Sequence, residues 1–231
     1  MAESRGFSSS FDEAWRAFEA GYKLVPMSAW RERLTAGRAQ FLSFQVPLSE
    51  LAIADAIEEL QDELADVDGL RLYDREMLHI SLRRVGFQVV AKKRPDDVTR
   101  EDVGRVTQRA AALLRGAKPV DVEVGAINAF PGALFLEVRD GGALGEIRSR
   151  LAGATDDAFG IADAQYLPHV TIAMFDNPAC VAALRERLPL LRQRPPIAAT
   201  IKSIELARWW FTGNDTDFPE RDPVRAYPLR G

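Results

Sequence analysis

Apolar and polar residues alternate in several short segments of the chain, and this alternation predicts β-strands with one buried face. The segments predicted as strands are residues 41–46, 71–82, 120–124, 134–138, 167–175 and 197–211. The third and fourth of these are close enough in sequence to form a hairpin. Pro131 and Gly132 lie between them and fit the middle of a type II turn.

Between the strands, apolar residues recur every three or four positions, as on one face of an amphipathic helix. The predicted helices cover residues 11–20, 50–64, 99–115, 144–151 and 178–188. Thr99 and Asp102 resemble a capping box, and residues 176–178 (Asp-Asn-Pro) place an N-cap before a proline. Strands and helices occur twice over, which predicts a duplicated α+β fold with two antiparallel lobes across a cleft.

The chain contains only two histidines, and each is followed two positions later by a hydroxyl residue. The pairs are His79 with Ser81 and His169 with Thr171. Because side chains alternate between the faces of a strand, each histidine shares a face with its hydroxyl residue. A single histidine on a strand is usually structural. The repeated pattern instead indicates two halves of one site.

The residues around both histidines match a known pattern. Residues 168–174 read P-H-V-T-I-A-M, where the pattern is commonly P-H-V-T-L-A-R, and residues 79–86 read H-I-S-L-R-R-V-G against H-x-T-L-x-F-x-G. Over residues 40–229 the chain therefore resembles the 2H phosphoesterase superfamily, with its 2′-5′ RNA ligase-like proteins and RNA 2′,3′-cyclic phosphodiesterases. The resemblance implies a bilobal fold with two antiparallel sheets facing a central cleft, helices outside, and both histidines in the cleft.

Two histidines suit hydrolysis of a 2′,3′-cyclic phosphate, an in-line displacement at phosphorus. One imidazole removes a proton from water and the other protonates the departing ribose oxygen. We expect His79 and His169 in these roles, without deciding which is the base. Ser81 and Thr171 are expected to bind the phosphoryl oxygens. The scheme requires neither cofactor nor metal, and no further histidine or cysteine stands at ligand spacing beside either motif.

Two positions depart from the family pattern. Five residues after the second histidine the family usually has arginine, but this chain has Met174, and Arg84 stands at the matching position after the first histidine. Arg84 is thus a candidate for a phosphate-binding cation supplied by the other lobe. Strict strand alternation would put Arg83 on the histidine face instead, and a bulge would be needed to bring Arg84 there. Both remain candidate substrate-binding residues, with solvated surface arginines as the alternative.

Composition and charge limit the partners. The net charge of −4 and the pI near 5.4 argue against binding of duplex nucleic acid, so we expect a nucleotide or an RNA terminus as substrate. Cys180 is the only cysteine, which excludes an internal disulfide and suggests a small buried residue. The N-terminus lacks a signal peptide's apolar region, and no apolar run reaches membrane-spanning length. We therefore expect a cytoplasmic monomer without a membrane partner.

Residues 1–39 precede the family-like region and are expected to form an N-terminal extension with the short amphipathic helix 11–20. Residues 40–231 are expected to form a single bilobal domain. The helix is expected to pack on the core. The alternative is a lid over the site, in which Tyr22 or Trp30 would reach a nucleotide base.

The resulting hypothesis is a metal-independent phosphodiesterase that opens 2′,3′-cyclic phosphates of RNA ends or nucleotides. Alternatives within the family are cleavage or joining of 2′-5′ linkages and hydrolysis of ADP-ribose 1″,2″-cyclic phosphate. A nucleotide- or RNA-end-binding module without turnover is the alternative from another class. The intact motifs favour the enzyme, whereas Met174 favours the module. Residues 209–211 (Trp-Trp-Phe) are expected in the core, with stacking on a base as the alternative.

Overall fold

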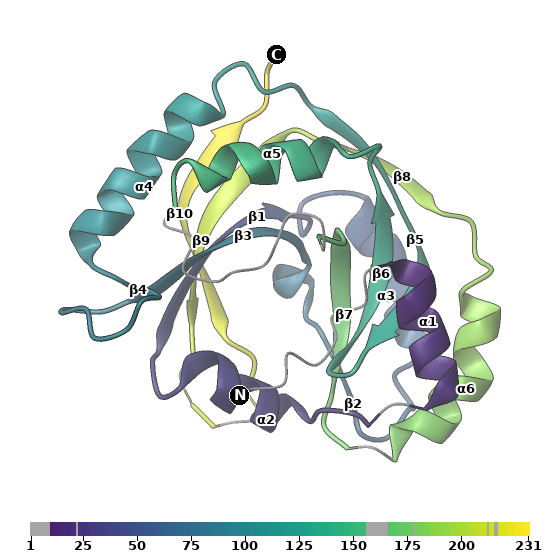
Figure 1. The fold of residues 1–231 in the computed structure, drawn as a ribbon. Helices are drawn as coiled ribbons and strands as arrows, with labels where there is room; N and C mark the ends of the chain where they lie inside the picture. The colour runs from purple at the N-terminus through teal and green to yellow at the C-terminus, as the bar shows by residue number, and fades with distance from the viewer. Residues whose placement is uncertain (1–9, 22, 156–165, 178, 212, 215–216) are drawn as a thin grey trace.

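The computed structural model of the protein describes residues 10–21, 23–155, 166–177, 179–211, 213–214 and 217–231. Its main feature is a curled sheet with helices arranged around it (Figure 1). The strands are β1 (Gln40–Pro47), β2 (Leu70–Leu72), β3 (His79–Gln88), β4 (Asp97–Val98), β5 (Val120–Phe130), β6 (Ala133–Arg139), β7 (His169–Phe175), β8 (Ile197–Ile201), β9 (Ser203–Trp210) and β10 (Glu220–Pro228). The helices are α1 (Phe11–Ala20), α2 (Met27–Thr35), α3 (Ile53–Asp62), α4 (Arg100–Leu113), α5 (Ala143–Ala152), α6 (Cys180–Leu191) and the 3₁₀ turn η1 (Arg75–Met77).

Across the sheet the strand order is β10-β9-β1-β3-β7-β6-β5-β8, with β2 beside β7 and β4 beside β3. This order is symmetric about the β3–β7 junction, and each half carries one histidine motif. The α+β fold with two related halves is therefore confirmed. The halves are not separate sheets, however. Ile80 of β3 pairs with Val170 of β7, and this pairing joins two strand edges that would otherwise leave backbone groups without partners.

Two predicted strands are interrupted in the structure. The predicted strand 71–82 is broken by η1, where the Met77 backbone N–H donates to the Asp74 carbonyl oxygen at 2.8 Å. The predicted strand 197–211 is two strands, because β8 pairs with β5 in one half and β9 pairs with β1 in the other. The chain thus passes from one half of the sheet to the other at Lys202.

The hydrophobic pattern did not predict α2 or β10. In β10 only Tyr227 is buried, as expected of an exposed edge strand that needs no apolar alternation. The α2 segment buries Met27, Arg31 and Thr35, a set with a single apolar member. The predicted turn between β5 and β6 is present, but Gly132 has no positive φ, so the turn is not type II.

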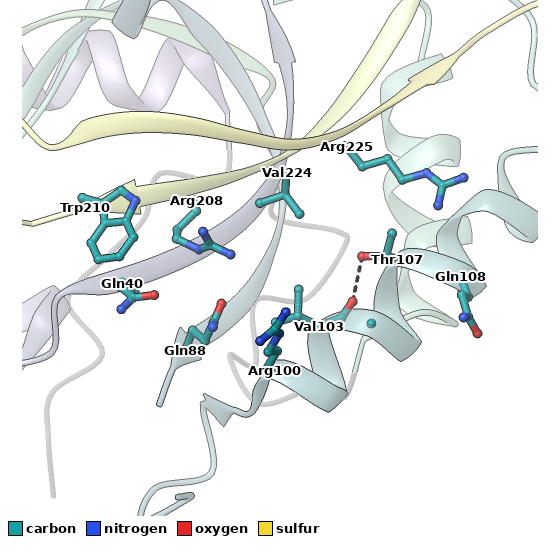
Figure 2. Close-up of a pocket in the computed structure, with 11 residues that line it drawn as sticks. Gln40, Gln88, Arg100, Val103, Thr107, Gln108, Arg208, Trp210, Val224 and Arg225 are labelled. Atoms are coloured by element: carbon teal, nitrogen blue, oxygen red, sulfur yellow. Dashed lines mark hydrogen bonds between the residues drawn. The ribbon is translucent and has the colours of Figure 1, made fainter. Parts of the chain in front are cut away.

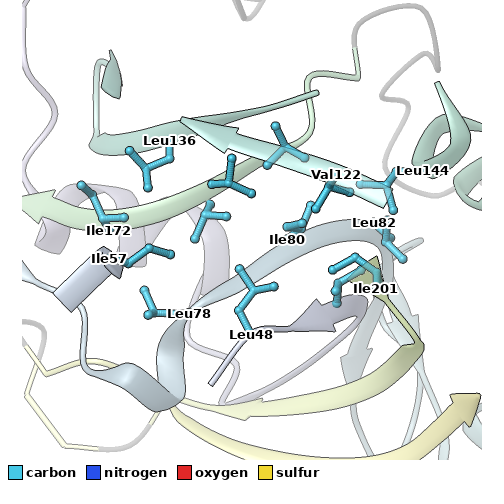
Figure 3. Packing of buried hydrophobic residues seen from close by; sticks show 14 of the residues in the cluster. Leu48, Ile57, Leu78, Ile80, Leu82, Val122, Leu136, Leu144, Ile172 and Ile201 are labelled. Atoms are coloured by element: carbon cyan, nitrogen blue, oxygen red, sulfur yellow. The ribbon is translucent and has the colours of Figure 1, made fainter. Parts of the chain in front are cut away.

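The main apolar core lies on one face of the sheet, against helices α3 to α6. Figure 3 shows Ile80 of β3 and Ile172 of β7 within this core, and both side chains are fully buried. Because side chains alternate along a strand, the polar side chains of both motifs turn to the opposite face of the sheet. We call this opposite face the motif face. Its motif residues are His79, Ser81, His169 and Thr171.

Helix α1 packs beside the β5–β6 hairpin (Figure 1). Ala14 and Phe18 are buried, and Phe18 belongs to the main core, so the predicted apolar stripe packs on the core as expected. At the start of the helix, the Phe11 carbonyl oxygen accepts a hydrogen bond from Nδ2 of Asn128 in β5 at 2.9 Å. The helix is thereby tied to the half of the sheet that carries His169.

Helix α2 packs on the other half of the sheet. The Trp30 ring lies 6.4 Å from the ring of Phe211, beside a second, smaller apolar cluster that includes Trp209. Tyr22 and Pro178, which also entered the sequence-based expectations, lie outside the described residues. Within the described ranges, no helix is both long and apolar enough to cross a membrane.

The helix ends follow local sequence signals. The predicted capping box is present: Oγ1 of Thr99 accepts from the backbone N–H of Asp102 at 3.3 Å, and the Asp102 carboxylate accepts from the backbone N–H of Thr99 at 2.8 Å. Before α6, Oδ1 of Asn177 accepts from the backbone N–H of Ala179 at 2.9 Å. Cys180 follows and is buried as predicted, and this burial raises the pKa of its thiol to about 11.

Candidate active site

The two histidines begin neighbouring strands, His79 in β3 and His169 in β7. These strands run antiparallel on either side of the single pair that joins them. His79 therefore lies on the side of Thr171, and His169 lies on the side of Ser81. The histidines are close enough for the charge of His169 to lower the pKa of His79. The structure thus brings the four motif side chains together.

Both imidazoles are held in the same way. Nδ1 of His79 lies 2.7 Å from the carbonyl oxygen of Met77, and Nδ1 of His169 lies 2.7 Å from the carbonyl oxygen of Leu167. A carbonyl oxygen can only accept a hydrogen bond, so Nδ1 carries the proton in both rings. In the neutral rings, Nε2 is therefore the nitrogen with a lone pair. The two Nε2 atoms are the ones available for proton transfer.

Aromatic side chains surround the histidines and lower their pKa values. The ring of His79 lies 4.9 Å from the ring of Trp209, and the ring of His169 meets Phe130 and Phe135 edge-on at 5.1 and 5.2 Å. Burial disfavours the charged imidazolium, and it lowers the pKa of both histidines. The pKa of His79 falls to about 4, because the charges of His169 and Arg221 add to the effect of burial.

The two hydroxyl residues differ in their surroundings. Ser81 is exposed, and its Oγ lies 3.1 Å from Nε2 of His79, so the hydroxyl donates to this nitrogen when the ring is neutral. Thr171 is half-buried. Both lie on the motif face, where either hydroxyl could instead donate to an oxygen of a bound phosphate.

A β-bulge follows the first motif. Ser81 pairs with Gln45 of β1, whereas Arg83 pairs with the adjacent residue Phe44, so Leu82 is an extra residue in β3. An extra residue changes which side chains point to which face beyond it. Strict alternation, on which the expectation for Arg83 depended, therefore does not hold in this strand.

The bulge puts the two arginines on different faces from those that alternation predicts. Arg84 pairs with Ser43 of β1, whose Oγ accepts a hydrogen bond from Nε1 of Trp209 at 3.2 Å on the motif face. Arg83 lies on the other face, where its side chain is buried and its Nε donates to Oγ1 of Thr155 at 2.6 Å. The expectation that Arg83 shares the histidine face is wrong, and Arg84 takes that place.

Arg84 has a second arginine nearby. Burial and the positive charge of Arg148 lower the pKa of Arg84. The Arg148 guanidinium lies 5.0 Å from the ring centroid of Tyr166 and donates to the carbonyl oxygen of Leu82 at 2.5 Å. The Tyr166 hydroxyl donates to the carbonyl oxygen of Ser81 at 2.9 Å. These contacts hold the bulge and place positive charge beside the first motif.

The second motif has a bulge at the matching position. Thr171 pairs with Phe135 of β6, whereas Ala173 pairs with the adjacent residue, so Ile172 is the extra residue in β7. Met174 therefore corresponds in position to Arg84 of the other half. It pairs with Arg71 of β2, and the sequence analysis missed that neighbour because only the tertiary structure adds β2 to β7.

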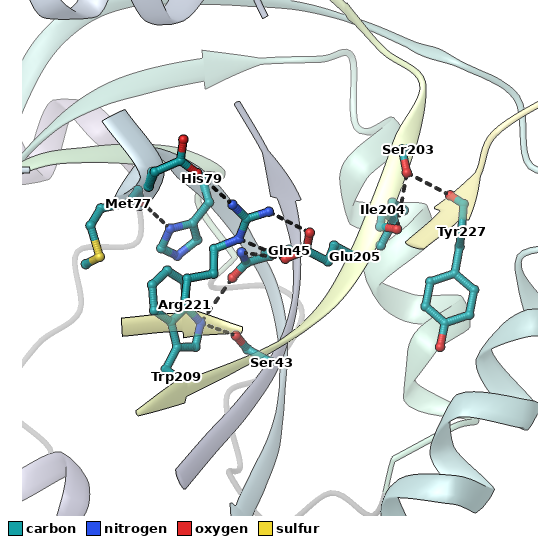
Figure 4. A network of polar contacts seen from close by, with 11 residues as sticks. Ser43, Gln45, Met77, His79, Ser203, Ile204, Glu205, Trp209, Arg221 and Tyr227 are labelled. Carbon is teal, nitrogen blue, oxygen red and sulfur yellow. Dashed lines mark hydrogen bonds and ion pairs between the residues drawn. The ribbon is translucent and has the colours of Figure 1, made fainter. Parts of the chain in front are cut away.

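A buried polar network supports His79 from behind (Figure 4). Nε1 of Trp209 donates to Oε1 of Gln45 at 3.1 Å, and Nε2 of Gln45 donates to Glu205 at 3.3 Å. Arg221 of β10 holds the two oxygens of Glu205 at 2.9 and 2.6 Å. The sequence analysis missed this network, because Gln45, Glu205 and Arg221 belong to no recognised motif. The fourth member, Trp209, was expected to pack in the core or to stack on a base.

In the part of the chain that the structure describes, no group of three or more His, Cys, Asp or Glu side chains is placed to hold a metal ion. The polar groups on the motif face are imidazole, hydroxyl and guanidinium groups of the chain itself.

Comparison with protein families identifies the chain. A family model described as the 2′-5′ RNA ligase superfamily matches residues 49–210, which is more than half of the sequence and includes both histidine motifs. The protein belongs to the 2′-5′ RNA ligase superfamily. This superfamily is part of the 2H phosphoesterases that the motifs resembled. None of the curated proteins matches the chain in sequence.

Several solved structures have the same fold as this 2′-5′ RNA ligase superfamily member. TT0787 of Thermus thermophilus matches with a TM-score of 0.60 and 17% identity, over 83% of this chain and 98% of its own. E. coli LigT in its apo form matches with a TM-score of 0.61 and 13% identity, over 84% and 100%. LigT complexed with 3′-AMP matches with a TM-score of 0.59 and 14% identity, over 84% and 99%. The chain has the fold and family of phosphoesterase-type enzymes.

Proposed function

We propose that the protein is a phosphodiesterase that opens 2′,3′-cyclic phosphates of RNA ends or nucleotides without a metal ion. The observation that carries this proposal is the matched pair of imidazoles on the motif face. Each has its Nδ1 bound to a backbone carbonyl and its Nε2 free of any backbone contact that the structure describes. Two proton-transfer groups at one site suit a reaction in which one oxygen loses a proton and another gains one.

In the proposed reaction, Nε2 of one histidine takes a proton from water as the water oxygen attacks phosphorus. The bond from phosphorus to one ribose oxygen breaks, and Nε2 of the other histidine protonates that oxygen. The product is a phosphomonoester. We assign the base to His79, because burial, together with the smaller effects of the His169 and Arg221 charges, lowers its pKa and keeps its ring neutral, and the acid to His169.

The remaining residues of the motif face stabilise the phosphoryl group. Its non-bridging oxygens carry negative charge through the transition state, and hydroxyl and guanidinium donors favour that charge. We assign Ser81 and Thr171 as hydroxyl donors and Arg84 as the guanidinium donor. Arg83 has no part in this scheme, since it lies on the opposite face. The similar E. coli LigT has been solved in complex with 3′-AMP and with ATP, which supports a nucleotide ligand for this chain.

Single substitutions test the pairing of the two histidines. His79→Ala and His169→Ala are each expected to lower kcat for a 2′,3′-cyclic mononucleotide by about 10²- to 10⁴-fold. The double variant should be little worse than either single one, because groups that act as a unit are not additive. The assay is run in excess chelator. Near wild-type activity in one single variant, or loss of wild-type activity in chelator that a divalent ion restores, would contradict the proposal.

A binding module without turnover is the second candidate, and one observation favours it. Met174 is buried where the family usually has an arginine, which removes one cation from the second motif. A panel of cyclic mononucleotides, oligonucleotides ending in a cyclic phosphate and 2′-5′ dinucleotides separates the candidates. Binding to a panel member without turnover of any member would favour the module. Cleavage of the 2′-5′ dinucleotides alone would favour a phosphodiesterase that acts on 2′-5′ linkages.

A further inference from the structure

A groove lies away from the motif face, between helix α4 and strands β9 and β10 (Figure 2). Its volume is about 670 Å³. Arg208 and Trp210 line it. In sequence they flank Trp209, and the Trp209 side chain contacts His79 on the other face of the sheet. Since neighbouring residues of a strand point to opposite faces, the groove is separate from the site proposed for catalysis.

The walls of the groove carry positive charge and one large aromatic ring. Arg100, Arg208 and Arg225 line it, and no acidic residue does so among those that the structure describes. Arg208 forms an ion pair with Asp222 at 2.8 Å, and its guanidinium lies 5.7 Å from the ring centroid of Trp210. Arg100 forms no ion pair within the described ranges. This combination suits a ligand with negative charge and a flat apolar face.

The helix wall leaves room for such a ligand. Gly104 lies inside α4 and lines the groove, and a Cβ atom added there would meet nothing within 4 Å. Glycine in a helix interior is unfavourable relative to alanine. The absence of a side chain here leaves this part of the groove wall open.

We propose that this groove is a second binding site, which takes a nucleotide. The base stacks on Trp210, and the phosphate is held by Arg208 and Arg100. Nucleotides combine a phosphate with an aromatic face, which are the two features that these walls recognise. The proposal does not depend on catalysis at His79 and His169.

Hydrogen–deuterium exchange with 5′-AMP as the probe tests the site. In the wild-type protein, 5′-AMP should slow amide exchange in residues 100–108 of α4, because ligand binding suppresses local opening. Gly104→Trp fills the groove and should abolish this protection. Gly145→Trp in α5 is the matched control, since a Cβ atom there also meets nothing within 4 Å, and it should retain the protection.

Two further measurements identify the ligand chemistry. Arg208→Gln should weaken 5′-AMP binding at this site by at least about tenfold, since it removes a charge-assisted contact. Ribose 5-phosphate lacks the base and should bind at least about tenfold more weakly than 5′-AMP. Protection that is absent in the wild type, or unchanged in Gly104→Trp, would overturn the site. Equal binding of ribose 5-phosphate would overturn its assignment to nucleotides. Both readouts are local to α4, so failure of the proposed catalysis leaves them unaffected.

Discussion

The imidazole of His79 lies against the indole of Trp209, with ring centroids 4.9 Å apart and ring planes tilted by 40°. The indole is held in turn by Ser43 and Gln45, which accept from its Nε1 at 3.2 and 3.1 Å. A fixed aromatic ring beside the imidazole excludes water from that side and disfavours the imidazolium. We therefore expect Trp209 to position the imidazole and, as part of the burial around it, to contribute to the low pKa of His79.

Replacing Trp209 should change the pKa of His79, beyond any effect that the substitution has on the stability of the fold. Trp209→Leu exposes the imidazole to water, so the pKa of His79 should rise toward its ordinary value. The acid limb of the kcat/KM profile should then move to higher pH. Trp15→Leu in α1 is the control, because Trp15 packs on Phe18 far along the chain from the motifs. An unchanged profile in Trp209→Leu would contradict the role assigned to the indole.

The pH dependence of the wild-type protein follows from the same burial. Catalysis needs one neutral and one protonated histidine, and that state is most populated between the two pKa values. Burial lowers both, with His79 at about 4 and His169 below 6.5. The maximum of kcat/KM should therefore lie on the acid side of pH 6.5, with activity falling on both sides. A maximum above pH 7 would show that the free protein does not hold the histidines in these surroundings.

The two adjacent arginines give a matched pair of variants. Arg84→Ala should lower kcat/KM by about 30-fold, equivalent to about 2 kcal/mol, the scale of a lost charge-assisted hydrogen bond. Arg84→Lys should restore part of the loss, because it keeps the charge without the guanidinium fork. Arg83→Ala should lower the Tm and leave kcat/KM nearly unchanged, since Arg83 bonds Thr155 on the other face. The reverse result would mean that β3 is regular in solution.

The ion pair between Arg221 and Glu205 should matter for both stability and titration. The two side chains are 13% and 7% exposed, so Arg221→Ala leaves a carboxylate largely buried without its partner. We expect a loss of about 3 kcal/mol in the free energy of unfolding, measured by urea denaturation. The pKa of His79 should rise in the same variant, because a nearby positive charge is removed.

A second substitution separates these effects of Arg221. The double variant Arg221→Met, Glu205→Gln removes both charges and keeps an acceptor for Gln45. It should therefore regain most of the stability that Arg221→Ala loses. If the double variant were as unstable as Arg221→Ala, the destabilisation would come from lost packing of β10 and not from the unpaired charge.

Local sequence determined which motif residues share a strand face, where a helix begins, and which family the motifs indicate. Alternation along a strand is a property of the backbone, so it correctly put His79 and Ser81 on one face and Ile80 in the core. The capping box at Thr99 likewise depends on residues three positions apart. Such features need no knowledge of the rest of the chain, and the paired motifs were sufficient to indicate the family.

The tertiary structure decided which arginine joins the site and what surrounds the histidines. The bulge at Leu82 is defined by pairing with β1, nearly forty residues earlier in the chain, and strand alternation cannot reveal an extra residue before the partner is known. Arg221 reaches the network from β10, an exposed edge strand whose sequence needs no apolar alternation. Periodicity specifies the face of a side chain within a regular strand, but register and long-range pairing depend on contacts between distant segments, and only the assembled sheet contains them.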